Sequence, residues 1–165
     1  MNESLVYKNG DFEVINEFYN NKPFFRKYTD DREIKITKVL QKNPHSNISD
    51  YYRISNKNKY VDMELLDVFK KISKENLINI AIKIKNYLQS IGIIYIDWKF
   101  DQFGVDNNGN IKLFDFDSSG LIDLKTNKWI IEPYKNGWSY KKALSIGLTN
   151  PYEIDNYSFT LNFLK

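Results

Sequence analysis

Charged and amide side chains gather between strongly apolar segments in the stretch YIDWKFDQFGVDNNGNIKLFDFDSSG, residues 95–120. The side chains in it that could take part in chemistry are Asp97, Lys99, Asp101, Gln102, Asp115 and Asp117. Carboxylates beside a lysine and an amide are costly to bury unless they find partners. The stretch is therefore either a solvated hairpin rim or a group of charges around a ligand that needs them.

A calcium loop is the first chemistry to test. Asp106, Asn108 and Asn110 match the first, third and fifth positions of an EF-hand loop. The sixth position, which requires glycine, is Ile111, and the twelfth, which requires a bidentate glutamate, is Asp117. We therefore exclude an EF-hand.

Phosphoryl transfer from ATP fits the same stretch better. The reaction needs a carboxylate to orient the attacking hydroxyl, a lysine to neutralise charge on the phosphoryl group, and oxygen ligands for magnesium. The Asn-Gly pair at 108–109, between apolar-alternating arms, predicts a hairpin. Such a hairpin brings the carboxylates on either side of it back together.

The letters and spacing resemble the protein-kinase catalytic loop, H-R-D-L-x-x-x-N, followed by a hairpin and D-F-G. This resemblance implies that Asp97 and Lys99 are catalytic, with Asp97 orienting the hydroxyl and Lys99 stabilising the developing charge. It also implies that Gln102 and Asp115 hold Mg²⁺, with help from Asp117. ATP and Mg²⁺ are the cofactors that follow.

The resemblance extends outward from this stretch. EIKITKVL is similar to the kinase αC helix, with Glu33 as its ion-pairing glutamate, although a solvated helix carboxylate is the alternative. YVDMELLD is similar to the fifth strand and hinge, with Met63 as gatekeeper and Glu64 to Leu66 facing adenine. EIDNYSFTLNF resembles the start of the αF helix, where Asp155 would brace the catalytic loop.

Several positions depart from the kinase pattern. Ile96 stands where many kinases have arginine, so an activation-loop phosphate would find no arginine there. Gln102 is one methylene longer than the usual asparagine, and Asp117 replaces the flexible glycine of D-F-G. The glycine-rich loop is reduced to Gly10.

The lysine that contacts the α- and β-phosphates is ambiguous in the sequence. PFFRKY offers both Arg26 and Lys27 for this position. Trp98, beside Asp97, either packs under the loop or offers a surface to a partner.

The resemblance implies an α+β, bilobal protein-kinase-like fold. A single minimal domain would span 1–165, with a small β-rich N-lobe and hinge over about 1–66 and a truncated helical C-lobe, ending at αF, over about 67–165. This outline is similar to the minimal effector kinases of bacterial pathogens, of the OspG and NleH type. It is also similar to the shortened kinase-like proteins of large DNA viruses, which are the alternative.

That likeness implies an ATP- and Mg²⁺-dependent Ser/Thr kinase acting on a protein substrate. It also implies a partner such as ubiquitin or a ubiquitin-conjugating enzyme–ubiquitin conjugate. Two alternatives stay open: a pseudokinase that binds without transferring phosphate, and a small-molecule phosphotransferase with the same magnesium logic.

Composition narrows the remaining possibilities. The 165 residues, 42% of them hydrophobic, suit one globular domain. With no cysteine and one histidine, His45, we exclude disulfides, thiolate chemistry and histidine-rich metal sites, and we interpret His45 as a turn residue. The net charge of +3 comes without a dense basic run, so we expect no nucleic-acid partner.

No cleaved signal and no membrane span are predicted. The N-terminal residues lack an apolar h-region, and no apolar run approaches the roughly 18 residues of a spanning helix. We expect a soluble cytoplasmic protein, and secretion into a host cytosol by a route without a cleaved signal is compatible with this pattern.

The elements that must position these residues follow from periodicity. We expect two or three strands over 4–28, a helix capped by Thr29 or Asp30, and a strand pair around the turn at 56–59. An apolar stripe predicts a helix over 74–90 that ends at Gly92. After the hairpin we expect irregular structure to about 150, and then a last helix to the end of the sequence.

Overall fold

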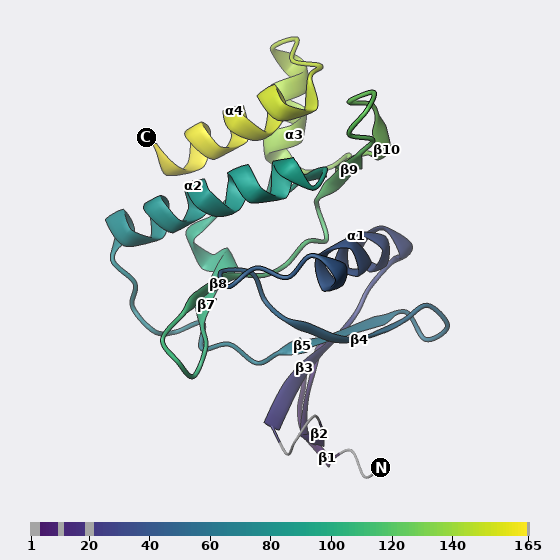
Figure 1. Ribbon diagram of the computed structural model, residues 1–165, viewed down its shortest axis with the longest axis vertical. Coiled ribbons are helices and arrows are strands. Elements are labelled where there is room, and N and C mark those ends of the chain that lie inside the picture. Colours follow the sequence, from purple (N-terminus) through teal and green to yellow (C-terminus); the bar gives the residue numbers. More distant parts are fainter. Residues whose placement is uncertain (1–3, 10–11, 19–21, 165) are drawn as a thin grey trace.

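The computed structural model describes residues 4–9, 12–18 and 22–164, and its architecture is mixed α+β, as expected. A five-stranded antiparallel sheet in the order β1-β2-β3-β5-β4 forms one end of the molecule (Figure 1). Its strands are β1 (Ser4–Asn9), β2 (Phe12–Phe18), β3 (Lys22–Tyr28), β4 (Tyr51–Ser55) and β5 (Tyr60–Glu64). The predicted strand pair around 56–59 is confirmed as β4 and β5.

Helix α1 (Asp31–Lys42) follows β3 and packs beside the sheet. Between the two capping candidates, Asp30 takes the role, since its carboxylate accepts a hydrogen bond from the Glu33 amide at 3.1 Å. The side chains of Ile34, Ile36 and Leu40 are buried. The cap fixes where the helix begins and hence which residues of its first turn face β3.

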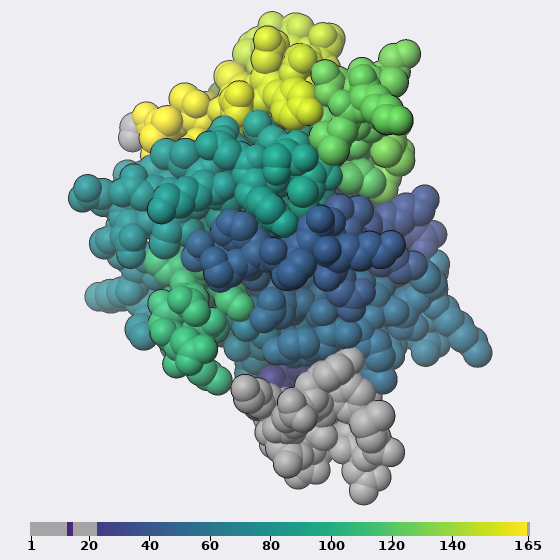
Figure 2. Space-filling model, in the orientation of Figure 1, coloured from purple at the N-terminus to yellow at the C-terminus, as the bar shows by residue number. Residues whose placement is uncertain are grey.

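Helix α2 (Lys74–Ser90) confirms the clearest helix prediction. Ser73 caps its first turn, and Leu77, Ala81, Ile84 and Leu88 form the buried stripe. The chain turns sharply at Gly92, whose φ of +85° suits glycine, and a Cβ there would approach the Ile122 carbonyl oxygen to 2.9 Å. In Figure 2, α1 lies between α2 and the sheet, and α4 covers the other side of α2.

Short elements follow α2. The predicted Asn-Gly hairpin is present as β7 (Phe103–Val105) and β8 (Ile111–Leu113), preceded by β6 (Ile93–Ile94) and a single 3₁₀ turn, η1, over Phe100–Gln102. The hairpin is joined to the sheet side of the molecule by two bridges, Ile48 with Leu113 and Asp67 with Val105. These bridges hold the β7–β8 hairpin against the residues just before β4 and just after β5.

The prediction of irregular structure up to residue 150 is wrong. The segment contains β9 (Gly120–Ile122), β10 (Trp129–Ile131) and α3 (Trp138–Ser145), before α4 (Pro151–Phe163). The two strands are three residues long, too short to show an alternating pattern, and β9 pairs with β6 far back in the chain. Asp123 closes the turn between them by accepting a hydrogen bond from the Lys125 amide at 2.8 Å.

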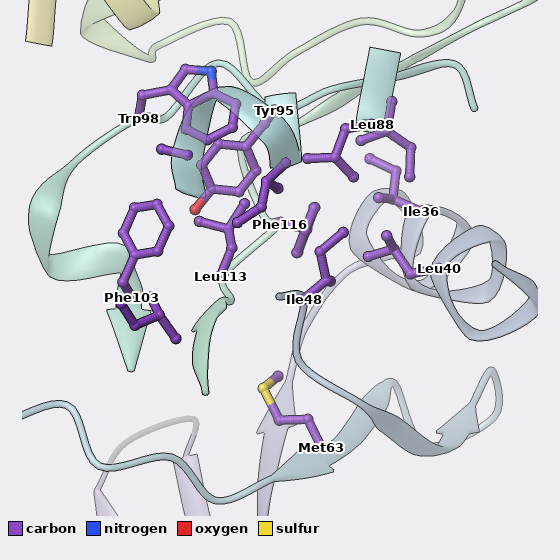
Figure 3. Close-up of a cluster of buried hydrophobic side chains, with 14 of the residues drawn as sticks. Ile36, Leu40, Ile48, Met63, Leu88, Tyr95, Trp98, Phe103, Leu113 and Phe116 are labelled. Carbon is purple, nitrogen blue, oxygen red and sulfur yellow. The ribbon is translucent and has the colours of Figure 1, made fainter. Parts of the chain in front are cut away.

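One apolar core runs from the sheet to the helices. Figure 3 shows Tyr95, Trp98 and Phe116 packed above Leu113 and Ile48, with Ile36 and Leu40 of α1 at one side. The α4 side chains Phe159 and Phe163 join the same cluster. In the part of the chain that is described, no helix is long and apolar enough to cross a bilayer.

Candidate functional site

Lys27 lies at the centre of a charged cluster. Its Nζ is 3.0 Å from Glu33 Oε1, 3.0 Å from Asp115 Oδ1 and 3.2 Å from Asp117 Oδ2. Strand β3, helix α1 and the loop after β8 thus meet at one ammonium group. Burial opposes the charge on Lys27, but the three carboxylates raise its pKa above the ordinary value.

Arg26 points to the other face of the sheet, because successive residues of a strand alternate. Its guanidinium binds the buried Asp62 carboxylate through two hydrogen bonds of 2.8 and 3.0 Å. Arg53 also contacts Asp62, at 3.2 Å, and both guanidinium groups lie over the Tyr60 ring. Of the two candidates in PFFRKY, Lys27 therefore joins the acidic cluster and Arg26 does not.

Glu33 is fully buried and ion-paired, so the solvated alternative is wrong for this carboxylate. Besides Lys27 it accepts a hydrogen bond from the Thr29 hydroxyl at 2.6 Å and from the Phe116 amide at 3.2 Å. Burial raises its pKa, while Lys27 and Thr29 work in the opposite direction. These contacts fix α1 against both β3 and the loop after β8.

Asp115 occupies a strained backbone position, with a φ of +66° that favours glycine. Such strain is retained where the surrounding structure imposes it, often at functional sites. Although burial disfavours its charged form, Lys27 holds the pKa of Asp115 below its usual value. Burial raises the pKa of Asp117, and the neighbouring Asp115 charge adds to this.

The loop before the hairpin brings the other three predicted residues together. Lys99 Nζ lies 3.0 Å from Asp97 Oδ1, and Gln102 donates its amide to Asp97 Oδ2 at 2.7 Å. The hydrogen bond to Asp97 raises the pKa of Lys99. Both oxygens of Asp97 are therefore occupied by side chains of its own loop.

Asp155 of α4 lies beneath this loop and is fully buried. Its Oδ1 accepts hydrogen bonds from the Ile96 amide at 3.0 Å and from Trp98 Nε1 at 2.8 Å. Gln89 donates to Oδ2 at 2.9 Å. Ile96 has a φ of +63°, so this carboxylate holds the residue before Asp97 in a conformation that a β-branched side chain disfavours.

Trp98 packs under the loop, which settles the question left open by the sequence. Its ring contacts Tyr95 at 4.7 Å, Tyr95 contacts Phe116 at 5.0 Å, and Phe116 contacts Tyr51 at 6.5 Å between centroids. This column of four rings connects the loop, the residue after Asp115 and the sheet. Figure 3 shows three of its members, Trp98, Tyr95 and Phe116. Sequence reasoning missed the column because its members come from three separate segments.

An apolar cavity of about 400 Å³ is lined by Phe114, the residue directly before Asp115. The rest of its lining comes from β2, β3, the end of β5, the segment after β5 and η1, and the full set comprises Val14, Phe25, Met63, Glu64, Leu65, Leu66, Val68, Phe69, Asp101 and Phe114. Within the described residues, the Leu66 backbone amide and carbonyl make no hydrogen bond. Gly104 allows β7 to approach this segment, since a Cβ there would lie 2.6 Å from Leu66 Cβ. Gly10 lies outside the described residues.

Glu64 lines this cavity, but its carboxylate is held elsewhere. Its Oε1 accepts a hydrogen bond from Lys112 Nζ at 2.6 Å and from the Asp50 amide at 2.9 Å. Lys112 is buried and also lies 3.4 Å from Asp50 and 3.6 Å from Asp106. A second cavity of about 560 Å³ adjoins this group, with His45 and Asn110 among its lining residues.

The sequence did not single out Lys112, because two of its three partners, Glu64 and Asp50, are 48 and 62 positions away. His45 lies in the turn after α1, as interpreted from the sequence. Its Nδ1 accepts a hydrogen bond from the Asn47 amide at 3.0 Å, and burial lowers its pKa.

Among the described residues, no three His, Cys, Asp or Glu side chains form a ready-made metal cage. Mg²⁺ does not require one, because it is commonly bound by one or two carboxylates together with phosphate oxygens and water. Asp115 and Asp117 place two carboxylates against the same ammonium group. Their chemistry fits a Mg²⁺ ion that arrives with a nucleotide.

No protein-family model matches this chain, and no curated protein matches its sequence.

Proposed function

We propose that this protein binds Mg-ATP and transfers the terminal phosphoryl group to a protein hydroxyl, with a protein-kinase-like fold. In this fold the five-stranded sheet and α1 form the smaller lobe, and α2 to α4 belong to the larger one. The observation that carries the proposal is the Lys27 cluster, where a strand lysine binds both a helix glutamate and the carboxylate after a hairpin. The residue before that carboxylate, Phe114, lines an apolar cavity.

The apolar cavity would receive the adenine ring. Met63, Phe25 and Phe114 supply apolar contacts, and the unpaired amide and carbonyl of Leu66 supply the donor and acceptor that an adenine edge needs. The Lys27 ammonium would contact the α- and β-phosphates. Its ion pair with the buried Glu33 holds it in position for this contact.

Asp115 and Asp117 would hold the magnesium ion, with Gln102 offering its amide oxygen. The ion supplies neutralisation of charge between the phosphates. Asp97 would orient the acceptor hydroxyl, and Lys99 would stabilise charge on the transferred group. Asp155 and Trp98 would act on the reaction only by holding this loop in place. Asp155 accepts hydrogen bonds from the Ile96 amide and the Trp98 indole and, among the described residues, none from Asp97, Lys99 or Gln102.

One observation favours the alternative, a pseudokinase that binds without transfer. Both Asp97 oxygens are engaged, by Lys99 and by Gln102. An acceptor hydroxyl would have to share Oδ2 with Gln102 or displace it. We place transfer first because Lys99 and Gln102 are both side chains that can turn toward phosphate or metal.

Transfer of label from γ-labelled ATP tests the proposal. The wild-type protein is expected to label itself or a protein mixture in the presence of Mg²⁺, and Asp97→Ala is expected to reduce labelling at least about 100-fold, the size of a general-base contribution. Asp31→Ala, which removes an exposed surface pair with Lys59, serves as the matched control and should label normally. Equal labelling by Asp97→Ala and wild type would contradict the proposal.

A further inference from the structure

A groove of about 340 Å³ lies between the segment that leads into α2 and the turn that follows Lys99. Its apolar lining comprises Val68, Ile72, Leu77, Phe100 and Phe103. The two charged side chains that line it, Lys70 and Lys74, are both cationic. The phosphoryl-transfer chemistry proposed above makes no use of this groove.

The rim of the groove exposes apolar surface to an unusual degree. Of the groove's lining residues, Val68 is 48% exposed and Phe100 40%. Phe69, which lines the neighbouring apolar cavity, is 92% exposed. Apolar side chains that are exposed together and bordered by polar ones mark interaction sites. The Lys74 ammonium lies 5.6 Å from the Phe100 ring centroid, so charge and apolar surface are presented side by side.

The groove leads to the candidate catalytic residues. Val68 lines both this groove and the apolar cavity proposed for adenine. Phe100 directly follows Lys99, whose ammonium lies 3.0 Å from Asp97. An extended chain in the groove therefore runs toward Asp97, and each of its residues advances it by about 3.3 Å.

The two lysines are available to a partner. In the described part of the chain, the side chains of Lys70 and Lys74 form no ion pair with a carboxylate. A carboxylate from outside would consequently not compete with an internal one. Ion pairs at such an exposed rim contribute modestly to affinity, but they discriminate strongly against partners of the wrong charge.

We propose that this groove binds an acidic, apolar segment of the protein substrate, with an apolar side chain on Val68 and Phe100 and carboxylates at Lys70 and Lys74. This inference rests on the proposed function, because it describes the substrate that the Asp97 loop would phosphorylate. It makes the protein selective for serine or threonine flanked by aspartate or glutamate and a large apolar residue.

Fluorescence anisotropy with three labelled peptides tests the groove without any ATP. The first peptide carries one serine flanked by leucines and glutamates, the second has lysine for every glutamate, and the third has serine for every leucine. The second and third peptides are both expected to bind the wild-type protein at least tenfold more weakly than the first, acidic peptide. Equal binding of the acidic and lysine peptides would overturn the inference.

The charge-reversal variant Lys70→Glu/Lys74→Glu gives the sharper comparison. It is expected to bind the acidic peptide at least tenfold more weakly and to bind the lysine peptide better than the wild type does. The control, Lys35→Glu/Lys83→Glu, makes the same net-charge change at exposed positions of α1 and α2 and should keep the wild-type preference. An equal loss in both variants would show that net charge alone is responsible and would overturn the inference.

A Mg-ATP-dependent thermal shift, measured on the same samples, separates the two proposals. Selective peptide binding without such a shift would count against the proposed function and support the groove. A shift with no peptide selectivity would support the nucleotide site and overturn the groove. The charge-reversal variant should keep the wild-type shift, which also shows that it is folded.

Discussion

Two buried lysines, Lys27 and Lys112, each lie among three carboxylates on different sides of the sheet-to-hairpin junction. Lys27 contacts Glu33, Asp115 and Asp117, and Lys112 contacts Asp50, Glu64 and Asp106. Both groups have the same formal charge. They differ in what else their carboxylates do.

The carboxylates around Lys112 serve the local backbone. Asp106 accepts hydrogen bonds from the Asn108 and Asn110 amides and so shapes the hairpin turn, and Glu64 accepts one from the Asp50 amide. Such bonds stabilise the ends of elements. We therefore regard Lys112 as a structural tie between β5 and β8.

The carboxylates around Lys27 come from α1 and from the loop after β8, where Phe114, directly before Asp115, lines the apolar cavity. Asp115 keeps a left-handed φ of +66°, which gives the loop no stability of its own. Like charges at a strained position are a costly arrangement that a ligand can justify. Both clusters have a cavity nearby, so neither charge count nor a cavity distinguishes them, and the contrast rests on the strained backbone at Asp115.

The largest expected effect is on phosphoryl transfer. Asp115→Asn should lower the transfer rate at least about 100-fold, because an amide replaces a carboxylate that, in the proposed site, would face the magnesium and phosphate charges. Asp106→Asn changes the matching carboxylate of the other cluster and should leave the transfer rate within about twofold. Single-turnover assays with labelled ATP measure both, and similar losses in the two variants would break the comparison.

The two lysines should separate binding from stability. Lys27→Met is expected to abolish the Mg-ATP-dependent thermal shift, because the phosphates lose their cation. Lys112→Met is expected to keep that shift but to lower the free energy of unfolding by roughly 3 kcal/mol, since the mostly buried Glu64 carboxylate loses its cation. Urea titrations with and without Mg-ATP measure both quantities. Loss of the shift only in Lys112→Met would reverse our assignment.

Neutralising a carboxylate that accepts a backbone hydrogen bond should change the free energy of unfolding by a smaller amount. Glu64→Gln should lower the free energy of unfolding by about 1 kcal/mol, since the amide oxygen still accepts the Asp50 amide and only the charge on Lys112 loses a partner. Glu33→Gln makes the same change in the first cluster and should also weaken Mg-ATP binding. Equal Mg-ATP affinity in both variants would contradict a positioning role for Glu33.

Asp155 offers a third case, a buried carboxylate whose direct donors are uncharged. Burial raises its pKa, and the hydrogen bonds from Gln89, Trp98 and the Ile96 amide offset this only in part. With a raised pKa the folded state binds more protons than the unfolded state, so this group lowers stability as pH rises above the ordinary aspartate value of about 4.

The variant Asp155→Asn should remove that pH dependence. It keeps an oxygen acceptor for Ile96 and Trp98, while the Gln89 amide can turn to accept from the new NH₂ group. Relative to the wild type, its urea midpoint should rise between pH 4 and pH 7. A difference that does not change with pH would show that Asp155 has no raised pKa.

Local patterns in the sequence predicted the parts of the fold that depend on neighbours. The stripe on α2, the cap at Asp30 and the Asn-Gly hairpin each follow from residues within a few positions of one another. The strands β9 and β10 escaped prediction because three residues carry too little pattern, and β9 is held by β6.

In the candidate site, too, the contacts within one loop could be predicted from the sequence and the contacts between distant segments could not. The grouping of Asp97, Lys99 and Gln102 lies within one loop and was predictable from spacing. The choice of Lys27 over Arg26 needed the face of β3, which depends on how β3 pairs with β2 and β5. The Lys112 cluster and the ring column require contacts across the whole chain, so no local pattern indicated them.

The central claim is that nucleotide binds at the Lys27 cluster and its apolar cavity. Photolabelling with 8-azido-ATP and Mg²⁺, followed by peptide mapping, tests it most directly. We predict label that ATP competes away on the peptide containing Met63 to Phe69, which lines the cavity. Label on the peptides that contain His45 or Asn110, at the Lys112 cavity, or no label that ATP displaces, would contradict the account.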